Sequence, residues 1–548
     1  MSDRPEPTRA RVGRALAALA VALSAVAAAS LPADAAPDGG GGHGHDRACE
    51  RRANNTYDKL LECVDAEGVF EHLEAFQQIA DDNGGTRASG TPGHDASADY
   101  VASKLEQAGY QVTRQRFEFP YFEELADPVL EVVSPTPALL ETGTFEFSGS
   151  GDVTGPVVPV DVNLDGDRAS DSGCEPEDFA GLDLSGDADI ALVQRGTCEF
   201  GVKALNAQEA GAEAVVIFNQ GNDPGRLDLI VGTLGEQAAG AVTIPVVGAS
   251  FDDGVTLSQP GTIAHVATET FLEFRTTENV IADSPWGDPD NVVMSGAHLD
   301  GVTAGPGIND NGSGSAALLE VALNMAKVHA PNKLRFAWWG AEESGLIGSW
   351  YYVDNLPQDE LDRIALYMNY DMVGSPNYIL MVYDADESTF AAADFGVEVP
   401  EGSTAIEDVY ESFYTWLGVP YDDTAFSGRS DYQAFILNGI PASGLFTGAE
   451  ETKTAEQAAI WGGTAGDWLD PCYHQACDTI DNVDRDAIEV NSDAMAFAAL
   501  TFAYSTEDVN GVPGRRVPGR PFPLPDPAGP EGTFGGGDGG AGPAHGSR

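Results

Sequence analysis

The chain has 548 residues, hydrophobic side chains at 42% of its positions and a formal net charge of −59 at neutral pH. Its 87 acidic residues against 28 Lys and Arg exclude nucleic-acid binding and binding to anionic membranes, because phosphate-rich partners repel such a surface. The acidic surface fits either plain solubility or adaptation to high salt, where ions screen the self-repulsion.

The first 35 residues have the pattern of a secretory signal peptide. Four arginines precede an apolar run at 15–29, and Ala33-Asp34-Ala35 follows as a cleavage site. The run is too short for a transmembrane helix, which needs about 20 apolar residues, and no later segment of the sequence is apolar enough or long enough to span a membrane. We therefore expect a secreted, extracellular protein without a membrane partner, in which residues 36–64 form a leader and N-terminal segment.

Six cysteines in an exported chain predict three disulfides. Proximity in sequence favours Cys49–Cys63, Cys174–Cys198 and Cys472–Cys477, although other pairings stay open. A cysteine-ligated zinc site is disfavoured because the chain has no C-x-x-C pair. The last disulfide would close a tight loop around Tyr473 and His474.

Residues 65–124 and 125–276 differ in character. In the first range a turn-rich loop leads into a helix, with Ala96, Tyr100 and Leu105 on one side, and then into an alternating strand from Tyr110 to Phe117. The second range has strand periodicity with frequent Gly, Asp and Pro, and it holds no cluster of metal ligands. We expect it to be an inserted β-rich domain with one or two helices, which either covers the site and selects substrates or serves as a stabilising spacer.

Three apolar runs in the second half of the chain end in residues that can bind a metal. The runs at 291–296, 334–339 and 366–370 are typical of buried strands, and a helical pattern lies between the first two at 316–326. The polar residues at or after these runs are His298, Asp300, Asp310, Glu342, Glu343 and Asp371. Open α/β sheets form their sites at the carboxyl ends of the strands, so we expect one shared metal site.

Imidazole and carboxylate ligands together suit zinc. His474, inside the predicted disulfide loop, is a further candidate ligand. Glu342 and Glu343 are neighbours, so their side chains point in different directions. One of them can bind the metal while the other acts as a general base.

Residues 507–548 consist largely of Gly and Pro without apolar periodicity. A segment of this composition cannot bury a core of its own. We expect a disordered tail.

The motifs of the second half resemble those of the M28 peptidase family, in particular secreted two-zinc aminopeptidases of the Streptomyces leucine aminopeptidase type. In chain order they are His298, GINDNGSG at 307–314, WWGAEESGLIGS at 338–349, NYDMVGS at 369–375, GRSDYQAF at 428–435, GLFTGAE at 444–450 and PCYHQACD at 471–478. The resemblance implies an α/β/α sandwich with a central mixed, mostly parallel sheet, built from residues 65–124 and 277–506. The stretch from Ala191 to Asn219 resembles a protease-associated (PA) domain, which assigns 125–276 to that module.

The resemblance also implies roles for individual residues. Asp310 would bridge two zinc ions, with His298 and Asp371 on one ion and Glu343 and His474 on the other. Glu342 would be the general base and Tyr473 a hydrogen-bond donor to the developing oxyanion. The peptide bond between Asp310 and Asn311 is expected to be cis. Candidate substrate-binding residues are Met372 and Phe446, as apolar walls, and Arg429; calcium is a further candidate cofactor.

The predicted function is hydrolysis of N-terminal residues, above all bulky apolar ones such as Leu, from peptides and proteins with a free N-terminus, by a monomer. Alternatives are a carboxypeptidase of the glutamate-carboxypeptidase type, a one-zinc glutaminyl cyclase, or a non-catalytic receptor-like module on the same fold. A carboxypeptidase needs an arginine cluster for the substrate carboxylate, and the region from Glu278 to Tyr504 has only Arg335, Arg363, Arg429 and Arg485. A receptor-like module is expected to have lost ligands, whereas none is missing from this sequence.

Overall fold

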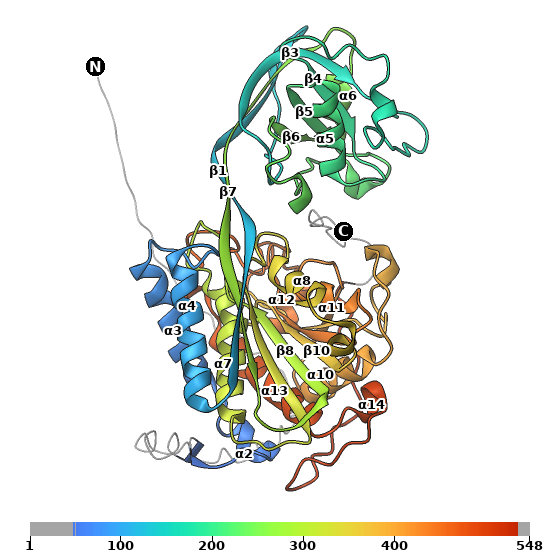
Figure 1. Ribbon diagram of the computed structural model, residues 1–548. Helices are drawn as coiled ribbons and strands as arrows, with labels where there is room; N and C mark the ends of the chain where they lie inside the picture. Colours follow the sequence, from blue (N-terminus) through green and yellow to red (C-terminus); the bar gives the residue numbers. More distant parts are fainter. Residues whose placement is uncertain (1–47, 50, 535–548) are drawn as a thin grey trace, which may run out of the picture. The chain divides into compact units, whose positions relative to one another are not determined.

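The computed structural model describes residues 48–49 and 51–534 (Figure 1). The predicted signal peptide lies outside the described residues, and within them no helix has the length and apolar character needed to cross a membrane. The strands are β1 Gln111–Ser134, β2 Ala138–Leu139, β3 Gly151–Pro159, β4 Ile190–Gln194, β5 Ala214–Phe218, β6 Val246–Ala249, β7 Ile263–Asp283, β8 Asp288–His298, β9 Asn332–Trp339, β10 Ile364–Tyr370, β11 Met381–Tyr383, β12 Asp422–Thr424 and β13 Ala442–Phe446. The α-helices are α2 Tyr57–Leu61, α3 Ala66–Asp82, α4 Pro92–Ala108, α5 Phe200–Ala210, α6 Phe251–Leu257, α7 Gly314–Met325, α8 Ile347–Asp354, α9 Gln358–Leu361, α10 Ser403–Leu417, α11 Tyr432–Ile436, α12 Ala455–Trp461, α13 Arg485–Tyr504 and α14 Glu507–Asn510.

The central sheet is mixed and mostly parallel, as predicted. Its strands follow the order β12-β11-β13-β10-β8-β9-β7. Strands β13, β10, β8 and β9 are parallel to one another, whereas β7 is antiparallel to β9 and β11 is antiparallel to β13. The three apolar runs form β8, β9 and β10, and the helical pattern after the first run forms α7. The carboxyl ends of four parallel strands therefore meet at one edge.

Helices cover both faces of this sheet. Alternate side chains of β9 enter different cores: Leu334, Phe336 and Trp338 pack on one face, and Ala337 and Trp339 on the other. The first core includes side chains of α3, α4, α7, α10 and α13, and the second includes side chains of α8 and α11. Figure 1 shows α3, α4 and α7 beside the sheet, and these three helices contact one another. The predicted α/β/α sandwich is confirmed.

Burial of the two tryptophans of β9 stabilises the sheet next to the site. Trp338 and Trp339 are both 0% exposed. A buried aromatic side chain of this size removes about 150–250 Å² from water, which corresponds to about 4–6 kcal/mol of transfer free energy. The strand that leads to Glu342 and Glu343 is therefore firmly anchored from both faces.

The inserted domain is joined to the sheet by a long antiparallel ribbon. Strand β1 has 24 residues and β7 has 21, and they pair from Gln111 with Asp283 to Ser134 with Ile263. The strand predicted at 110–117 therefore exists but is much longer than its sequence pattern indicated. The predicted boundary at 124 coincides with a register shift between Glu124 and Ala126.

Within the inserted domain, β3, β4, β5 and β6 are parallel neighbours. Helices α5 and α6 follow β4 and β6, in agreement with the predicted β-rich module with one or two helices.

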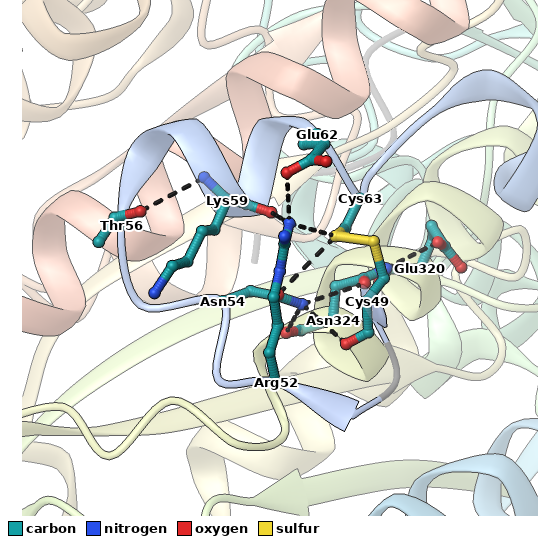
Figure 2. The surroundings of a disulfide bond; sticks show 9 residues. All are labelled: Cys49, Arg52, Asn54, Thr56, Lys59, Glu62, Cys63, Glu320 and Asn324. Atoms are coloured by element: carbon teal, nitrogen blue, oxygen red, sulfur yellow. Dashed lines mark hydrogen bonds and ion pairs between the residues drawn. A yellow bond between two sulfur atoms is a disulfide. The ribbon is translucent and has the colours of Figure 1, made fainter. Parts of the chain in front are cut away.

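All three favoured disulfides are present: Cys49–Cys63, Cys174–Cys198 and Cys472–Cys477. Figure 2 shows the first of them. There the Arg52 guanidinium donates to the Lys59 carbonyl at 3.0 Å, and the Asn54 amide donates to the Asn324 carbonyl at 3.1 Å. This segment is thereby attached to α7.

In the N-terminal segment, Leu60 and Val64 are buried in the first core of the sandwich. The expectation for the other end of the chain needs correction. The predicted disorder of 507–548 is wrong for the described part of the tail, 507–534. There Phe522 packs against Trp416 at a ring-centroid distance of 4.6 Å, and the Thr533 amide donates to Asp422 at 2.9 Å. The tail has no core of its own, but Phe522 packs against the first core of the sandwich.

Candidate active site

The candidate ligands are brought together at the carboxyl edge of the sheet. His298 is the last residue of β8, Asp371 follows β10, and the pair Glu342-Glu343 lies in the loop after β9. Asp310 lies in the turn Ile308–Ser313, which leads into α7; the backbone angles of Asp310 itself are not helical. His474 is held in the loop closed by Cys472 and Cys477. The positions of His298, Glu342-Glu343 and Asp371 follow from the local fold, because parallel strands deliver the residues after them to the same edge.

These residues form two groups that share Asp310. His298, Asp310 and Asp371 offer ligand atoms within 4.8 Å of one another, and so do Asp310, Glu343 and His474. The two oxygens of Asp310 face different imidazoles: Oδ1 lies 3.3 Å from Nε2 of His298, and Oδ2 lies 3.2 Å from Nε2 of His474. The outer carboxylates complete the groups, with Asp371 Oδ1 at 3.1 Å from His298 Nε2 and Glu343 Oε2 at 3.0 Å from His474 Nε2.

Neighbouring side chains orient these groups. Nδ1 of His298 lies 3.1 Å from the Asp300 carbonyl, which favours the tautomer with the proton on Nδ1 and a free lone pair on Nε2. The Ser430 hydroxyl donates to Asp371 Oδ2 at 2.5 Å, which leaves Oδ1 for the centre of the site. Oε1 of Glu343 is buried without a hydrogen-bond partner among the described residues.

The loop that carries Asp310 is fixed by residues that the sequence analysis did not single out. The carboxylate of Asp478 accepts hydrogen bonds from the backbone amides of Asn309 at 2.8 Å and Asp310 at 3.0 Å. Asp470 accepts one from the Asn309 side chain at 2.7 Å. The predicted cis peptide bond between Asp310 and Asn311 is present. Asp478 directly follows Cys477, which closes the loop around His474. This position in the sequence could have indicated that Asp478 lies near the site.

Glu342 belongs to neither group. Its Oε2 lies 4.0 Å from Nε2 of His298, and the residue is 8% exposed. Burial raises the pKa of Glu342 well above its ordinary range; His298 opposes this shift when its imidazole is protonated, and the negative charge of Asp371 adds to it. Glu342 is therefore a buried carboxyl group with a raised proton affinity beside the two ligand groups.

The donor set fits a pair of divalent cations. Burial raises the pKa of Glu343 to about 7, and the negative charge of Asp310 adds to this shift. Several carboxylates this close together in a buried site repel one another unless cations neutralise them. One imidazole nitrogen and carboxylate oxygens in each group are ligands that zinc accepts.

A mainly apolar pocket opens beside the two groups. Its wall includes the predicted Met372, Phe446 and Arg429, and also Met381, Phe390, Phe395 and Phe534. These last four were missed because they lie on a three-residue strand, in the segment between β11 and α10 and in the tail, where no periodic pattern marks them. Tyr473 also lines the pocket, and its ring stacks on His474 with centroids 3.9 Å apart.

The Arg429 guanidinium already donates hydrogen bonds to other residues of the protein. It donates to Glu450 Oε1 at 2.7 Å and to the Tyr473 hydroxyl oxygen at 3.2 Å. Burial raises the pKa of Tyr473 well above its ordinary range, and the negative charge of Asp310 adds to this. Tyr473 therefore keeps its proton and accepts from Arg429 through its oxygen, so that its own O–H is free to donate.

Comparison with known proteins agrees with this geometry. Residues 279–499 match the model of peptidase family M28, and residues 153–257 match the PA domain. An aminopeptidase of Pseudomonas aeruginosa is 47% identical over 456 residues, which cover 82% of this chain and 83% of that protein. The chain belongs to peptidase family M28. It is an aminopeptidase-type metalloexopeptidase with an inserted PA domain, and both matched ranges lie inside the predicted domains.

Two further similar proteins have names that state an activity. A probable leucine aminopeptidase 2 of Aspergillus fumigatus is 41% identical, over 77% of this chain and 80% of its own length. The solved structure of BSAP, a zinc aminopeptidase from Bacillus subtilis, is 25% identical with a TM-score of 0.51, over 79% of this chain and 94% of its own.

Proposed function

We propose that this M28 peptidase is a secreted, zinc-dependent aminopeptidase that removes bulky apolar N-terminal residues from peptides and proteins. The observation that carries the proposal is the placement of Asp310, whose two oxygens face two separate imidazole–carboxylate groups. A carboxylate that uses both oxygens in this way is suited to a pair of metal ions.

Two zinc ions are proposed as cofactors. His298, Asp310 and Asp371 would hold the first, and Asp310, Glu343 and His474 the second. Zinc is favoured by the mixed nitrogen and oxygen ligands and by the name of the similar zinc aminopeptidase of Bacillus subtilis. When bound, the ions would supply Lewis-acid polarisation of the scissile carbonyl and lower the pKa of a water molecule.

Glu342 is proposed as the general base. Its carboxylate takes the proton of the attacking water and then delivers it to the amine that leaves, as expected of a group outside both ligand sets. Its raised pKa supports the second step, because a base must hold the proton long enough to return it. Tyr473 donates its O–H to the oxyanion that develops on the former carbonyl oxygen.

The charge of the site supports an aminopeptidase over a carboxypeptidase. The substrate α-amine would be placed beside Glu342 and Asp371, where negative charge favours an ammonium group. A carboxypeptidase would instead need free cations for a terminal carboxylate. Arg429 is the only arginine among the described residues that line the pocket, and it is already paired with Glu450.

The pocket wall supports a preference for apolar first residues. Met372, Phe390 and Phe446 lie on it, and a leucine side chain would bury its surface among them. The name of the similar leucine aminopeptidase 2 of Aspergillus fumigatus agrees with this preference.

Secretion is proposed from the predicted signal peptide and from the three disulfides, which persist in oxidising compartments. N-terminal sequencing of protein recovered from culture medium should show a start after Ala35. Intact residues 1–35 on the recovered protein would contradict it.

The decisive test is a panel of aminoacyl-p-nitroanilides, each paired with its N-acetylated version. We expect the leucine substrate to be cleaved and its acetylated partner to be inert, because acetylation removes the ammonium group. Equal cleavage of both would overturn the aminopeptidase proposal. Cleavage of a peptide only from its C-terminus would favour the carboxypeptidase.

A further inference from the structure

A second cluster of carboxylates adjoins the substrate pocket, whose wall includes its member Asp423. It is formed by Asp384 and Asp386 after β11, Glu407 and Glu411 one turn apart on α10, and Asp423 on β12. Two triads share Glu407: Asp384, Asp386 and Glu407, and Glu407, Glu411 and Asp423. In each triad one carboxylate oxygen per residue lies within 4.8 Å of the others. None of the five residues belongs to the two ligand groups around Asp310.

Two of these carboxylates are buried with one oxygen unused. Glu407 is 1% exposed and Asp423 is 0% exposed. Glu407 Oε2 accepts from the Asp386 amide at 2.9 Å, and Asp423 Oδ2 accepts from the Ser388 hydroxyl at 3.1 Å. Glu407 Oε1 and Asp423 Oδ1, in contrast, have no hydrogen-bond partner among the described residues. A buried oxygen without a partner costs free energy, so a missing ligand is indicated between them.

The largest charges that act on Glu407 are themselves carboxylates. After burial itself, the largest influences on Glu407 are the carboxylates of Glu411, Asp386, Asp384 and Asp423. Together they raise the pKa of Glu407 to about 10, and burial followed by the charge of Asp423 raises the pKa of Glu411 to about 8. The cluster must therefore take up either protons or a metal ion at neutral pH.

We propose that this cluster is a calcium site, with Glu407 as the ligand common to both triads. The donors are all carboxylate oxygens from three elements, which suits calcium because it accepts six to eight oxygen ligands in flexible geometry. Zinc prefers nitrogen or sulfur among its ligands, and this cluster provides neither. The exposed side chain of Asp386 leaves the site open to solvent, so that an ion can enter.

A calcium ion bound by this cluster would be linked to the wall of the substrate pocket through Asp384. The Asp384 carboxylate accepts hydrogen bonds from the backbone amides of Ser388 at 2.9 Å, Thr389 at 2.9 Å and Phe390 at 2.6 Å. Phe390 lies in the pocket wall. An ion bound by the cluster would therefore hold this loop, which follows β11, to α10 and β12.

The test is titration of the zinc-loaded enzyme with CaCl2 in calcium-free buffer, followed by calorimetry and thermal unfolding. We expect saturable binding and a rise in Tm of about 3–5 °C when calcium is in 100-fold excess over Kd. Glu407→Gln should remove both responses. Without calcium its Tm should equal or exceed that of the wild type, because a buried unpaired carboxylate has been replaced by a neutral amide.

Asp408→Asn is the matched control, since Asp408 is the next residue on the same helix and is exposed. This variant should keep the full response to calcium. Glu411→Gln is a second site variant that should lose the response if Glu407→Gln does not fold. Absence of any wild-type response up to about 10 mM CaCl2, which is above the range of weak extracellular sites, would overturn the proposal. So would an unchanged response in both site variants, or an equal response to MgCl2.

Discussion

Replacement of Glu342 by Gln isolates the proton-transfer step. The substitution preserves the size of the side chain but removes the base, and it leaves His298, Asp310, Glu343, Asp371 and His474 unchanged. General acid–base catalysis contributes a factor of about 10²–10⁴, equivalent to about 2.7–5.4 kcal/mol in the activation barrier. We expect kcat to fall by this factor with zinc content unchanged, because Glu342 Oε2 lies 4.0 Å from Nε2 of His298 and Glu342 belongs to neither ligand group.

The assay combines hydrolysis of leucine p-nitroanilide with zinc analysis of the same sample. Glu343→Gln is the matched control, since it makes the same chemical change one residue along the chain. Glu343 Oε2 lies 3.0 Å from His474 Nε2, so this control should lose zinc as well as activity. The proposed roles are refuted if Glu342→Gln loses zinc while Glu343→Gln retains it, because the two glutamates would then have exchanged functions.

Three further substitutions test the oxyanion donor, the pocket and the tail. Tyr473→Phe should lower kcat about 10²–10³-fold with zinc retained, the usual effect of losing one oxyanion donor, and an unchanged kcat would exclude that role. Phe446→Ala should reduce kcat/KM about 10–100-fold for the leucine substrate and much less for the alanine substrate, since about 1.5–3 kcal/mol of apolar burial is lost; equal losses would remove Phe446 from the pocket. Phe522→Ala should lower the free energy of unfolding by about 1–2 kcal/mol in denaturant titration, whereas the exposed Pro523→Ala should change it little, and equal effects would show that the tail does not stabilise the domain.

The sheet and several ligand positions could be predicted because these ligands come at or shortly after the ends of apolar strands in the sequence. His298 and Asp371 stand at or next to the ends of β8 and β10, so the apolar runs that predict the strands also place these two side chains at one edge. The place of His474 among the ligands was implied by the resemblance to the M28 family, since this residue follows no strand of the sheet; the disulfide closes the loop that holds it.

The remainder of the pocket depends on contacts between distant segments without periodic patterns. Phe390 lies in an irregular loop and Phe534 in a Gly/Pro-rich tail, and only the folded chain brings them to the wall near Phe446. The tail was predicted to be disordered from its composition. Phe522 nevertheless packs on Trp416, because an ordered domain surface provides the partner that the segment itself lacks.

Zinc stoichiometry in the active enzyme tests directly whether Asp310 bridges two metal ions. Plasma mass spectrometry of purified protein, with leucine p-nitroanilide activity measured at each added equivalent of zinc after chelation, should give two zinc ions per chain at full activity. The chelated protein should be inactive and should recover when zinc is returned. One zinc ion per chain in fully active protein would contradict the bridging role of Asp310 and the two-zinc mechanism that depends on it.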